Sequence, residues 1–475
     1  MDENREWVRL SSFILGAVEP ESQTDAWGLP GTTNCCSRTR LIASLIGRPR
    51  RSHPNPTSTR RPGVDLLVQR CAGVDIGKDE VVACVRTPGE AGQRHKETRT
   101  FSSFTAQLEA MADWFTAEGV TEVVMEATGS YWKSPWYVLE ERGFELKLVN
   151  ARHVKILPGR KSDVADAEWL AELLEHGLLR GSFVPPPAIR ELRDLTRYRK
   201  RLVQTHTAEC QRIHKTLEDA GIKLDSVASD VLGVSGRAML AALVAGERDP
   251  DVLAELAKGR LRSKIPQLRQ ALRGRFRAHH ALLIGLCLDH TAHLEAAIAS
   301  LDGRVDAVMA PFERARDHLD TITGVGKRAA ETIIAEIGTD MSVFPTAGHL
   351  ASWAGMAPGN NITGGKRHSG KTTKGDVWLA DMLTQCAWSA ARSRDTYLSS
   401  QFWRLARRIG KKKAAVAVGH SILVICWHLL TNDADYDDLG GDYFVRRGNT
   451  ARHQDRLVEQ LQQLGYHVTL RKAAA

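Results

Sequence analysis

Residues 66–77 read LLVQRCAGVDIG, an apolar run rich in β-branched side chains that ends in glycine. A second apolar run, EVVACVRT (Glu80–Thr87), follows almost at once. Runs of this length and composition, bounded by turn residues, predict a pair of β-strands. KETRTFSS (Lys96–Ser103) predicts a third strand, so the three runs together indicate a meander.

Beyond this meander the pattern alternates between helix and strand. Helical periodicity covers residues 104–118 and 131–142, and strands are predicted at 121–128 and 144–150. A further helix is predicted from Asp163 to Leu174. Strands that alternate with helices predict an α/β layer with a mixed sheet.

Four acidic residues fall where this layer would gather them. Asp75 ends the first strand and Glu126 ends the fourth, although a core strand would rather carry Val or Ile there. Asp163 and Asp166 open the following helix at i, i+3, on one side of a turn. Converging carboxylates repel one another unless a cation lies between them. The pattern therefore favours a two-metal site for Mg²⁺ (or Mn²⁺) over an acidic helix start that faces solvent.

The rest of the chain is mainly helical, and it begins after Pro185–Pro187. The run Ala414–Leu430 is short for a bilayer span and carries two histidines, so it predicts a buried helix. We predict five parts along the chain: a disordered basic extension (1–65), an α/β catalytic domain (66–184), a helical coiled-coil domain (185–314), a mainly α-helical C-terminal domain (315–435) and a C-terminal tail (436–475).

The charge balance predicts a polyanionic partner. The chain of 475 residues has a formal net charge of +9, which makes nucleic acid the default partner. In the long helix predicted at 189–217, cationic residues repeat at helical spacing on one face, and such a face either contacts phosphates or is merely solvated. These residues are Arg190, Arg193, Arg197, Lys200 and Arg201.

A second candidate for nucleic-acid contact lies in the C-terminal domain, in HLDTITGVGKRAAETIIAEIG (His318–Gly338). Two helices joined by a GVG turn are typical of a helix-hairpin-helix. Gly324 and Gly326 would let backbone N–H groups approach a phosphate beside the start of the second helix, next to Lys327.

At these motifs the chain resembles the DEDD transposases of bacterial insertion sequences. The resemblance is carried by GVDIGK, VVMEATGSYW, GRKSDVADAEWLAELL, ITGVGKRAAETIIAEIG and LASWAGMAPGNNITGGKRHSGKTTKGD, in the family's order, and spans about Cys71 to Leu430. It implies a RuvC-like domain of RNase H fold, a helical middle and a separate C-terminal transposase domain. It also implies a site-specific DNA recombinase, with Asp75, Glu126, Asp163 and Asp166 as the metal-binding catalytic acids.

Further expectations follow from the resemblance. The family uses an element-encoded bridge RNA, assembles as a homo-oligomer (dimer or tetramer), and attacks DNA with a serine that precedes a small residue, Gly and Lys. Here Thr363 holds that place, so Thr363 and Ser369 both stay open as the nucleophile, with Thr363 favoured. Cationic residues of the same loop would offset phosphate charge: Lys366, Arg367, Lys371 and Lys374.

Three other functions are open to a chain of this kind. A junction-resolving nuclease that only hydrolyses DNA would need the four acids but not the loop at 363–374. A sugar-kinase or actin-like ATPase would need a second Gly-rich phosphate loop, which the sequence lacks. A non-catalytic RNA-binding protein would tolerate loss of all four acids. For the transposase, we expect a cytoplasmic bacterial protein that does not bind membranes.

Overall fold

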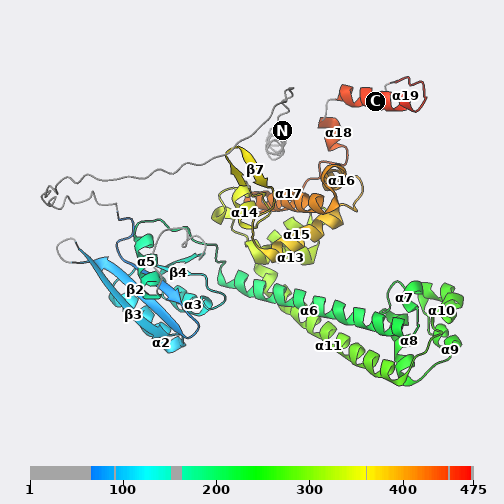
Figure 1. Ribbon diagram of the computed structural model, residues 1–475, viewed down its shortest axis with the longest axis horizontal. Helices are drawn as coiled ribbons and strands as arrows, with labels where there is room; N and C mark the ends of the chain where they lie inside the picture. The colour runs from blue at the N-terminus through cyan, green and yellow to red at the C-terminus, as the bar shows by residue number, and fades with distance from the viewer. Residues whose placement is uncertain (1–65, 90–92, 151–162, 360, 448–449, 472–475) are drawn as a thin grey trace, which may run out of the picture. The chain divides into compact units, whose positions relative to one another are not determined.

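The computed structural model describes residues 66–89, 93–150, 163–359, 361–447 and 450–471. A five-stranded sheet with strand order β3-β2-β1-β4-β5 forms the N-terminal layer (Figure 1). Because β1 pairs antiparallel with β2 and parallel with β4, the predicted mixed sheet is confirmed. The extension predicted as disordered, 1–65, lies outside the described residues. The strands are β1 (Cys71–Ile76), β2 (Glu80–Pro88), β3 (Arg94–Ser102), β4 (Glu122–Glu126) and β5 (Glu145–Val149).

Helices cover both faces of this sheet. Side chains alternate along β1, so Ala72, Val74 and Ile76 pack in one cluster with α2 (Thr105–Ala117) and α3 (Lys133–Glu141). Cys71, on the opposite face, packs with leucines of α5 (Asp163–Glu175). The elements from β2 to α5 begin and end within two residues of their predicted ranges, because apolar periodicity and glycine breaks mark them clearly. The first strand is shorter than predicted, since β1 begins at Cys71 and not at Leu66.

The middle of the chain is a long helical hairpin. It is formed by α6 (Pro187–Asp219) and α11 (Ala278–Met309). The two helices run antiparallel, as the contacts of Glu191 with Arg304 and of Asp219 with His280 show. A separate small core of buried Leu and Ile side chains holds the far end of the hairpin together. The elements between the arms are α7 (Leu224–Val227), α8 (Val234–Ala245), α9 (Pro250–Glu255), η3 (Gly259–Lys264) and α10 (Ile265–Ala271).

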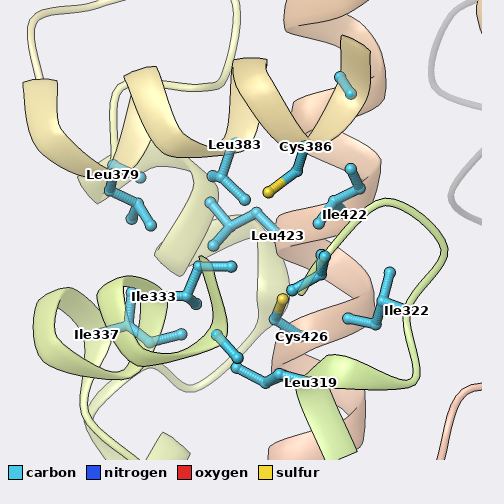
Figure 2. Packing of buried hydrophobic residues seen from close by; sticks show 14 of the residues in the cluster. Leu319, Ile322, Ile333, Ile337, Leu379, Leu383, Cys386, Ile422, Leu423 and Cys426 are labelled. Atoms are coloured by element: carbon cyan, nitrogen blue, oxygen red, sulfur yellow. The ribbon is translucent and has the colours of Figure 1, made fainter. Parts of the chain in front are cut away.

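The C-terminal half has its own hydrophobic core. Leucine, isoleucine and cysteine side chains from α12, α13, α15 and α17 interlock in it (Figure 2). The same core includes Ile189 and Leu192 of α6 and Val305 of α11. Both helices of the long hairpin are therefore packed into it at one end. The elements of this half are η4 (Ala310–Phe312), α12 (Glu313–Asp320), α13 (Lys327–Ile337), η5 (Met341–Val343), α14 (Ala347–Trp353), β6 (Asn361–Thr363), β7 (Lys366–Ser369), α15 (Val377–Ala390), α16 (Tyr397–Ile409), α17 (Lys411–Asn432), α18 (Tyr443–Arg447) and α19 (Thr450–Gln463).

Two described helical segments are long and apolar enough to cross a membrane, by length and composition only: Ala278–Asp320 and Lys411–Asn432. The second is α17, whose Ala414, Val418 and Ile422 are buried in the C-terminal core. The predicted buried helix is therefore confirmed, and its apolar composition is explained by packing.

His318 on α12 fastens the chain that follows α17. Its Nδ1 lies 2.7 Å from an Asp435 oxygen and its Nε2 lies 3.0 Å from an Asp433 oxygen. Only the doubly protonated ring donates to both carboxylates. The hydrogen bond to Asp435, together with Asp433, accordingly raises the pKa of His318 above its usual 6.5.

This arrangement predicts a pH-dependent stability. A raised folded-state pKa means that the stabilisation is full below about pH 6.5 and is lost as the pH rises through the folded-state pKa. With about 1 kcal/mol net from the two charge-assisted bonds, the thermal midpoint of wild type should fall about 1–2 °C more than that of His318→Asn between pH 6 and pH 8.5. His349→Asn is the matched control, because His349 bonds a threonine hydroxyl. Equal falls in wild type and His318→Asn would contradict the prediction.

Candidate functional site

The register of the sheet brings two of the predicted acids together. In the parallel β1–β4 pair, Val74 lies opposite Met125, so Asp75 and Glu126 occupy the next pair of positions. Asp75 has the same parity as Cys71 along β1, and Glu126 has the same parity as Val124 along β4. Cys71 and Val124 both pack on the α5 face. Asp75 and Glu126 therefore lie at adjoining strand ends on the face that α5 covers.

Helix α5 carries the other two acids toward this point. The Cys71 thiol lies 3.5 Å from the Ala171 carbonyl oxygen, and a Cβ added to Gly73 would lie 2.3 Å from the Ala167 carbonyl oxygen. Thus α5 runs antiparallel to β1, with Ala171 above Cys71 and Ala167 above Gly73. Asp163 lies one further helical turn back, about 6 Å, and Asp75 lies two residues on, about 6.6 Å.

The α5 start is therefore at the level of Asp75. Asp166, next to Ala167, is partly buried. The side chain of Asp163 lies outside the described residues. Gly73 is required by this arrangement, because any larger residue would push α5, and both of its aspartates, off the sheet.

A buried ion cluster anchors the other end of α5. Glu175 is fully buried and accepts a 2.5 Å hydrogen bond from Arg86 Nε on β2, and it also forms an ion pair with Arg94 on β3. Backbone N–H groups of Leu67 and Val68 donate to the Glu175 carbonyl oxygen. These contacts connect α5 with β2 and β3 and with the segment that leads into β1.

The donor set of the four acids suits a hard divalent cation. Carboxylate oxygens from separate segments are what Mg²⁺ and Mn²⁺ prefer. Another group of possible ligands among the described residues, Asp219, His279 and His280, is less suitable. His280 Nδ1 accepts from the Arg277 N–H and Nε2 lies 2.9 Å from Asp219 Oδ2. Both ring nitrogens are thus engaged where α11 begins, which gives this group a structural role.

The loop that carries the two candidate nucleophiles is a two-stranded arm. Thr363 pairs with Lys366 in the β6–β7 hairpin, around Gly364 and Gly365 with φ of +58° and +76°. Two successive positive φ values are those of a type I′ turn, which explains the Gly-Gly pair. Ser369 pairs with Asn361 at the other end of the hairpin. The backbone therefore places Thr363 at the tip and Ser369 at the base, while their side chains lie outside the described residues.

The arm also carries the predicted cationic residues. Lys366, Lys371 and Lys374 are exposed, and the side chain of Arg367 lies outside the described residues. At the base of the arm two backbone segments are in close contact, because a Cβ on Gly375 would lie 2.2 Å from the Gly355 backbone nitrogen. The hairpin tip therefore stands on a narrow, glycine-built base.

Most of the predicted cationic face of α6 is engaged with acids. Arg190 donates to both oxygens of Glu140, at 3.0 and 2.5 Å. Lys200 forms an ion pair with Asp381. Arg193 and Arg197 both reach Glu336, a fully buried carboxylate on α13, at 3.1 and 2.7 Å. Burial raises the pKa of Glu336 to about 7, against the opposing effect of the Arg197 hydrogen bond.

These ion pairs give four of the five residues a structural role. The exception is Arg201, which is exposed and has no acidic partner among the described residues. Its guanidinium carbon lies 5.6 Å from the centre of the Trp378 ring, within cation–π range. Arg201 is therefore the member of this face with a side chain available to a phosphate.

The GVG turn divides into a packed half and an open half. Gly324 has a φ of +89°, and a Cβ there would lie 2.6 Å from the Cys386 carbonyl oxygen on α15, so its conformation and its packing both require glycine. Gly326 caps α13 and faces open space. Lys327 is exposed and pairs with Asp306 at 2.7 Å. The open start of α13 is thus the part of the turn that a phosphate could approach.

Comparisons with known proteins agree with this architecture. A family model described as "Transposase" matches residues 72–222, and a model of the "Transposase IS116/IS110/IS902 family" matches residues 316–404. The transposase for insertion sequence element IS1111A of Coxiella burnetii is 25% identical over 375 residues, 77% of this chain and 90% of that protein. The putative transposase y4pF/y4sB of Sinorhizobium fredii is 26% identical over 344 residues, 70% of this chain and 78% of that protein.

A solved structure of Thermus thermophilus RuvC matches 24% of this chain and 100% of that chain, at 13% identity and a TM-score of 0.20. One family model covers the sheet that carries the acids, and the other covers the helices around the β6–β7 hairpin. Both models describe transposases. The chain belongs to the IS116/IS110/IS902 family of transposases, so the family expected from the sequence is confirmed.

Proposed function

We propose that this transposase cuts and rejoins DNA to excise and insert its own insertion sequence, with the α/β layer as a RuvC-like nuclease domain of RNase H fold. The observation that carries the proposal is the placement of Asp75 and Glu126 at adjoining strand ends, beneath the start of the helix that carries Asp163 and Asp166. A core strand more commonly carries Val or Ile at such positions.

In this proposal the four carboxylates hold Mg²⁺ (or Mn²⁺). Such ions, when bound, activate the attacking hydroxyl and stabilise the leaving oxygen in phosphoryl transfer. The chain's part is to hold the acids in a fixed arrangement: β1 and β4 fix two of them by register, and α5 fixes the other two by its packing over Gly73 and its anchor at Glu175.

The arm supplies the second chemical group. In this proposal the Thr363 hydroxyl oxygen forms a bond to a DNA phosphorus as one phosphorus–oxygen ester bond breaks. The hydroxyl proton passes to a base, and the departing DNA oxygen takes up a proton. Exposed Lys366 and Lys374 offset the charge on the phosphate. The resemblance adds an element-encoded bridge RNA as guide and a homo-oligomer in which acids and arm from different subunits meet.

A junction-resolving nuclease is the second candidate, favoured by the acids alone. An excision assay separates the two functions. Cells that express the protein and carry a plasmid with the gene and its flanking DNA should yield the rejoined donor junction, detected by amplification across it. Deleting the non-coding flank should abolish that product if an encoded RNA guides the enzyme. Nicked or linear plasmid without any rejoined junction would favour the nuclease and contradict the proposal.

The ion pairs on α6 sharpen the test for nucleic-acid contact. Arg201→Ala should reduce the slope of log affinity against log salt by about one unit, similarly for unrelated DNA sequences, because one phosphate contact is lost. Fluorescence anisotropy with labelled duplexes measures this slope. Arg304→Ala is the control, since Arg304 is exposed on the neighbouring helix but pairs with Glu191. A slope unchanged by Arg201→Ala would leave Arg201 as a solvated residue.

A further inference from the structure

An open cleft of about 600 Å³ lies on the α2 and α3 side of the sheet, where β1 ends. Its apolar lining comes from Ile76, Val81, Pro135 and Val138, of which Ile76, Val81 and Pro135 are buried. Tyr131, which is 45% exposed, also lines it. The cleft thus combines apolar side chains with an accessible aromatic ring.

The remaining lining is polar, and the part of it that suits an anion is the set of hydroxyls with Lys78, because Lys133 pairs with Asp194 and Arg142 with Asp113. Four serine or threonine side chains and three cationic ones line the cleft, with two glutamates and Tyr137. The helices α2 and α3 both start there, at Thr105 and Lys133, without a side-chain cap and without an acidic residue in the first turn. The hydroxyls belong to Ser103, Thr105, Ser130 and Ser134, the cations are Lys78, Lys133 and Arg142, and the acids are Glu109 and Glu141.

The position of the cleft relates it to the four acids. Ile76, Gly77 and Lys78 line it and follow Asp75 directly in the chain. The side chain of Ile76 points to the α2 and α3 face, whereas Asp75 points to the α5 face. The cleft and the acids therefore lie on opposite faces of the same sheet edge, about one residue apart along β1.

We propose that this cleft holds one unstacked nucleotide of the DNA strand that the acids cut. Its base lies against Val138 and Tyr131, and its phosphate lies at the two uncapped helix starts beside the hydroxyls and Lys78. A cavity of this size, apolar with a few converging polar groups, is typical of small-ligand sites, and stacking on an aromatic ring tolerates any base. The inference rests on the proposed function for the identity of the substrate.

The test uses the full-length protein and a 12-nucleotide oligothymidylate that carries one 5-iododeoxyuridine. Ultraviolet crosslinking followed by peptide mapping should place the adduct within residues 130–142. Thr105→Glu and Ser134→Glu put a negative charge at the two helix starts. Because acidic residues are favourable at helix starts, both variants should fold at least as well as wild type. Each should reduce the affinity for the oligonucleotide by roughly tenfold, because the added carboxylate repels the phosphate, and reduce the crosslink in parallel.

Val234→Glu is the matched control, since Val234 is exposed at the first residue of α8, outside the cleft. It should leave affinity and crosslink unchanged. Asp75→Asn should keep the crosslink while it loses cleavage, so failure of the cleft and failure of the catalytic acids give different results. Undiminished affinity and crosslinking in both Thr105→Glu and Ser134→Glu would overturn the inference. So would full competition by equimolar thymidine monophosphate, because the site would then take free nucleotides.

Discussion

Asp75→Asn should reduce DNA strand cleavage by about a thousandfold or more and leave folding intact. A bound divalent ion contributes several kcal/mol to phosphoryl transfer, and each 1.36 kcal/mol is a factor of ten in rate. The amide has nearly the volume of the carboxylate but no charge, so it weakens the binding of the divalent ion without disturbing the packing of β1. Cleavage of the element's end DNA in Mg²⁺, measured on sequencing gels, gives the rate.

The control for Asp75→Asn is Glu97→Gln, which makes the same change in charge and shape on β3 of the same sheet, away from β1 and β4. Circular dichroism and the thermal midpoint of both variants should match wild type. Cleavage by Asp75→Asn at the rate of Glu97→Gln would remove Asp75 from the catalytic site.

The second large effect is expected at the tip of the arm. Thr363→Ala should abolish the covalent protein–DNA adduct on nicked DNA, because no hydroxyl remains at the turn. Ser369→Ala should keep the adduct, since Ser369 pairs with Asn361 at the base of the hairpin and is displaced from the tip by the length of β7. Thr363→Ser should keep or increase it, because a primary alcohol is less hindered. Denaturing gels with labelled DNA detect the adduct, and mass spectrometry maps the modified peptide.

The competing assignment makes the opposite prediction. An adduct that survives Thr363→Ala and disappears in Ser369→Ala would move the nucleophile to the base of the hairpin. An adduct that survives both substitutions would exclude the arm's two hydroxyls as nucleophiles.

The strand pattern of the α/β layer could be predicted because its signals are local. Apolar runs, glycine breaks and helical periodicity lie within each element, and the parity of Asp75 and Glu126 follows once the strands are known. The role of Gly73 was not predictable, because its neighbour, the Ala167 carbonyl oxygen, comes from a helix nearly a hundred residues away. The close packing of α5 on β1 is a tertiary contact.

The cationic face of α6 shows where sequence reasoning fails. Helical spacing correctly places Arg193 and Arg197 on one face of α6. Their partner Glu336 lies on α13, about 140 residues further along the chain, and no sequence pattern indicates that these residues pair. Truncating both arginines would leave a buried carboxylate without its cationic partners, which costs about 3–5 kcal/mol, and truncating either one removes part of this stabilisation. Loss of DNA binding in those variants would therefore report on folding, whereas Arg201 reports on contact.

In the GVG turn, too, the sequence could not show which contacts the glycines make. A GVG turn between helices is compatible with phosphate contact, yet the first glycine is explained by its approach to the backbone of α15. Only the second, Gly326, faces open space. A glycine motif identifies a close approach, and the structure is needed to tell whether protein or ligand makes it.

The central claim, that the four acids form a divalent metal site, is tested most directly by anomalous diffraction at the manganese edge from crystals grown with Mn²⁺. We expect anomalous peaks between the carboxylates of Asp75 and Glu126, under the start of α5, and the loss of these peaks in Asp75→Asn crystals. Peaks confined to other groups, such as Asp219, His279 and His280, or an ordered four-acid cluster without any peak, would contradict it.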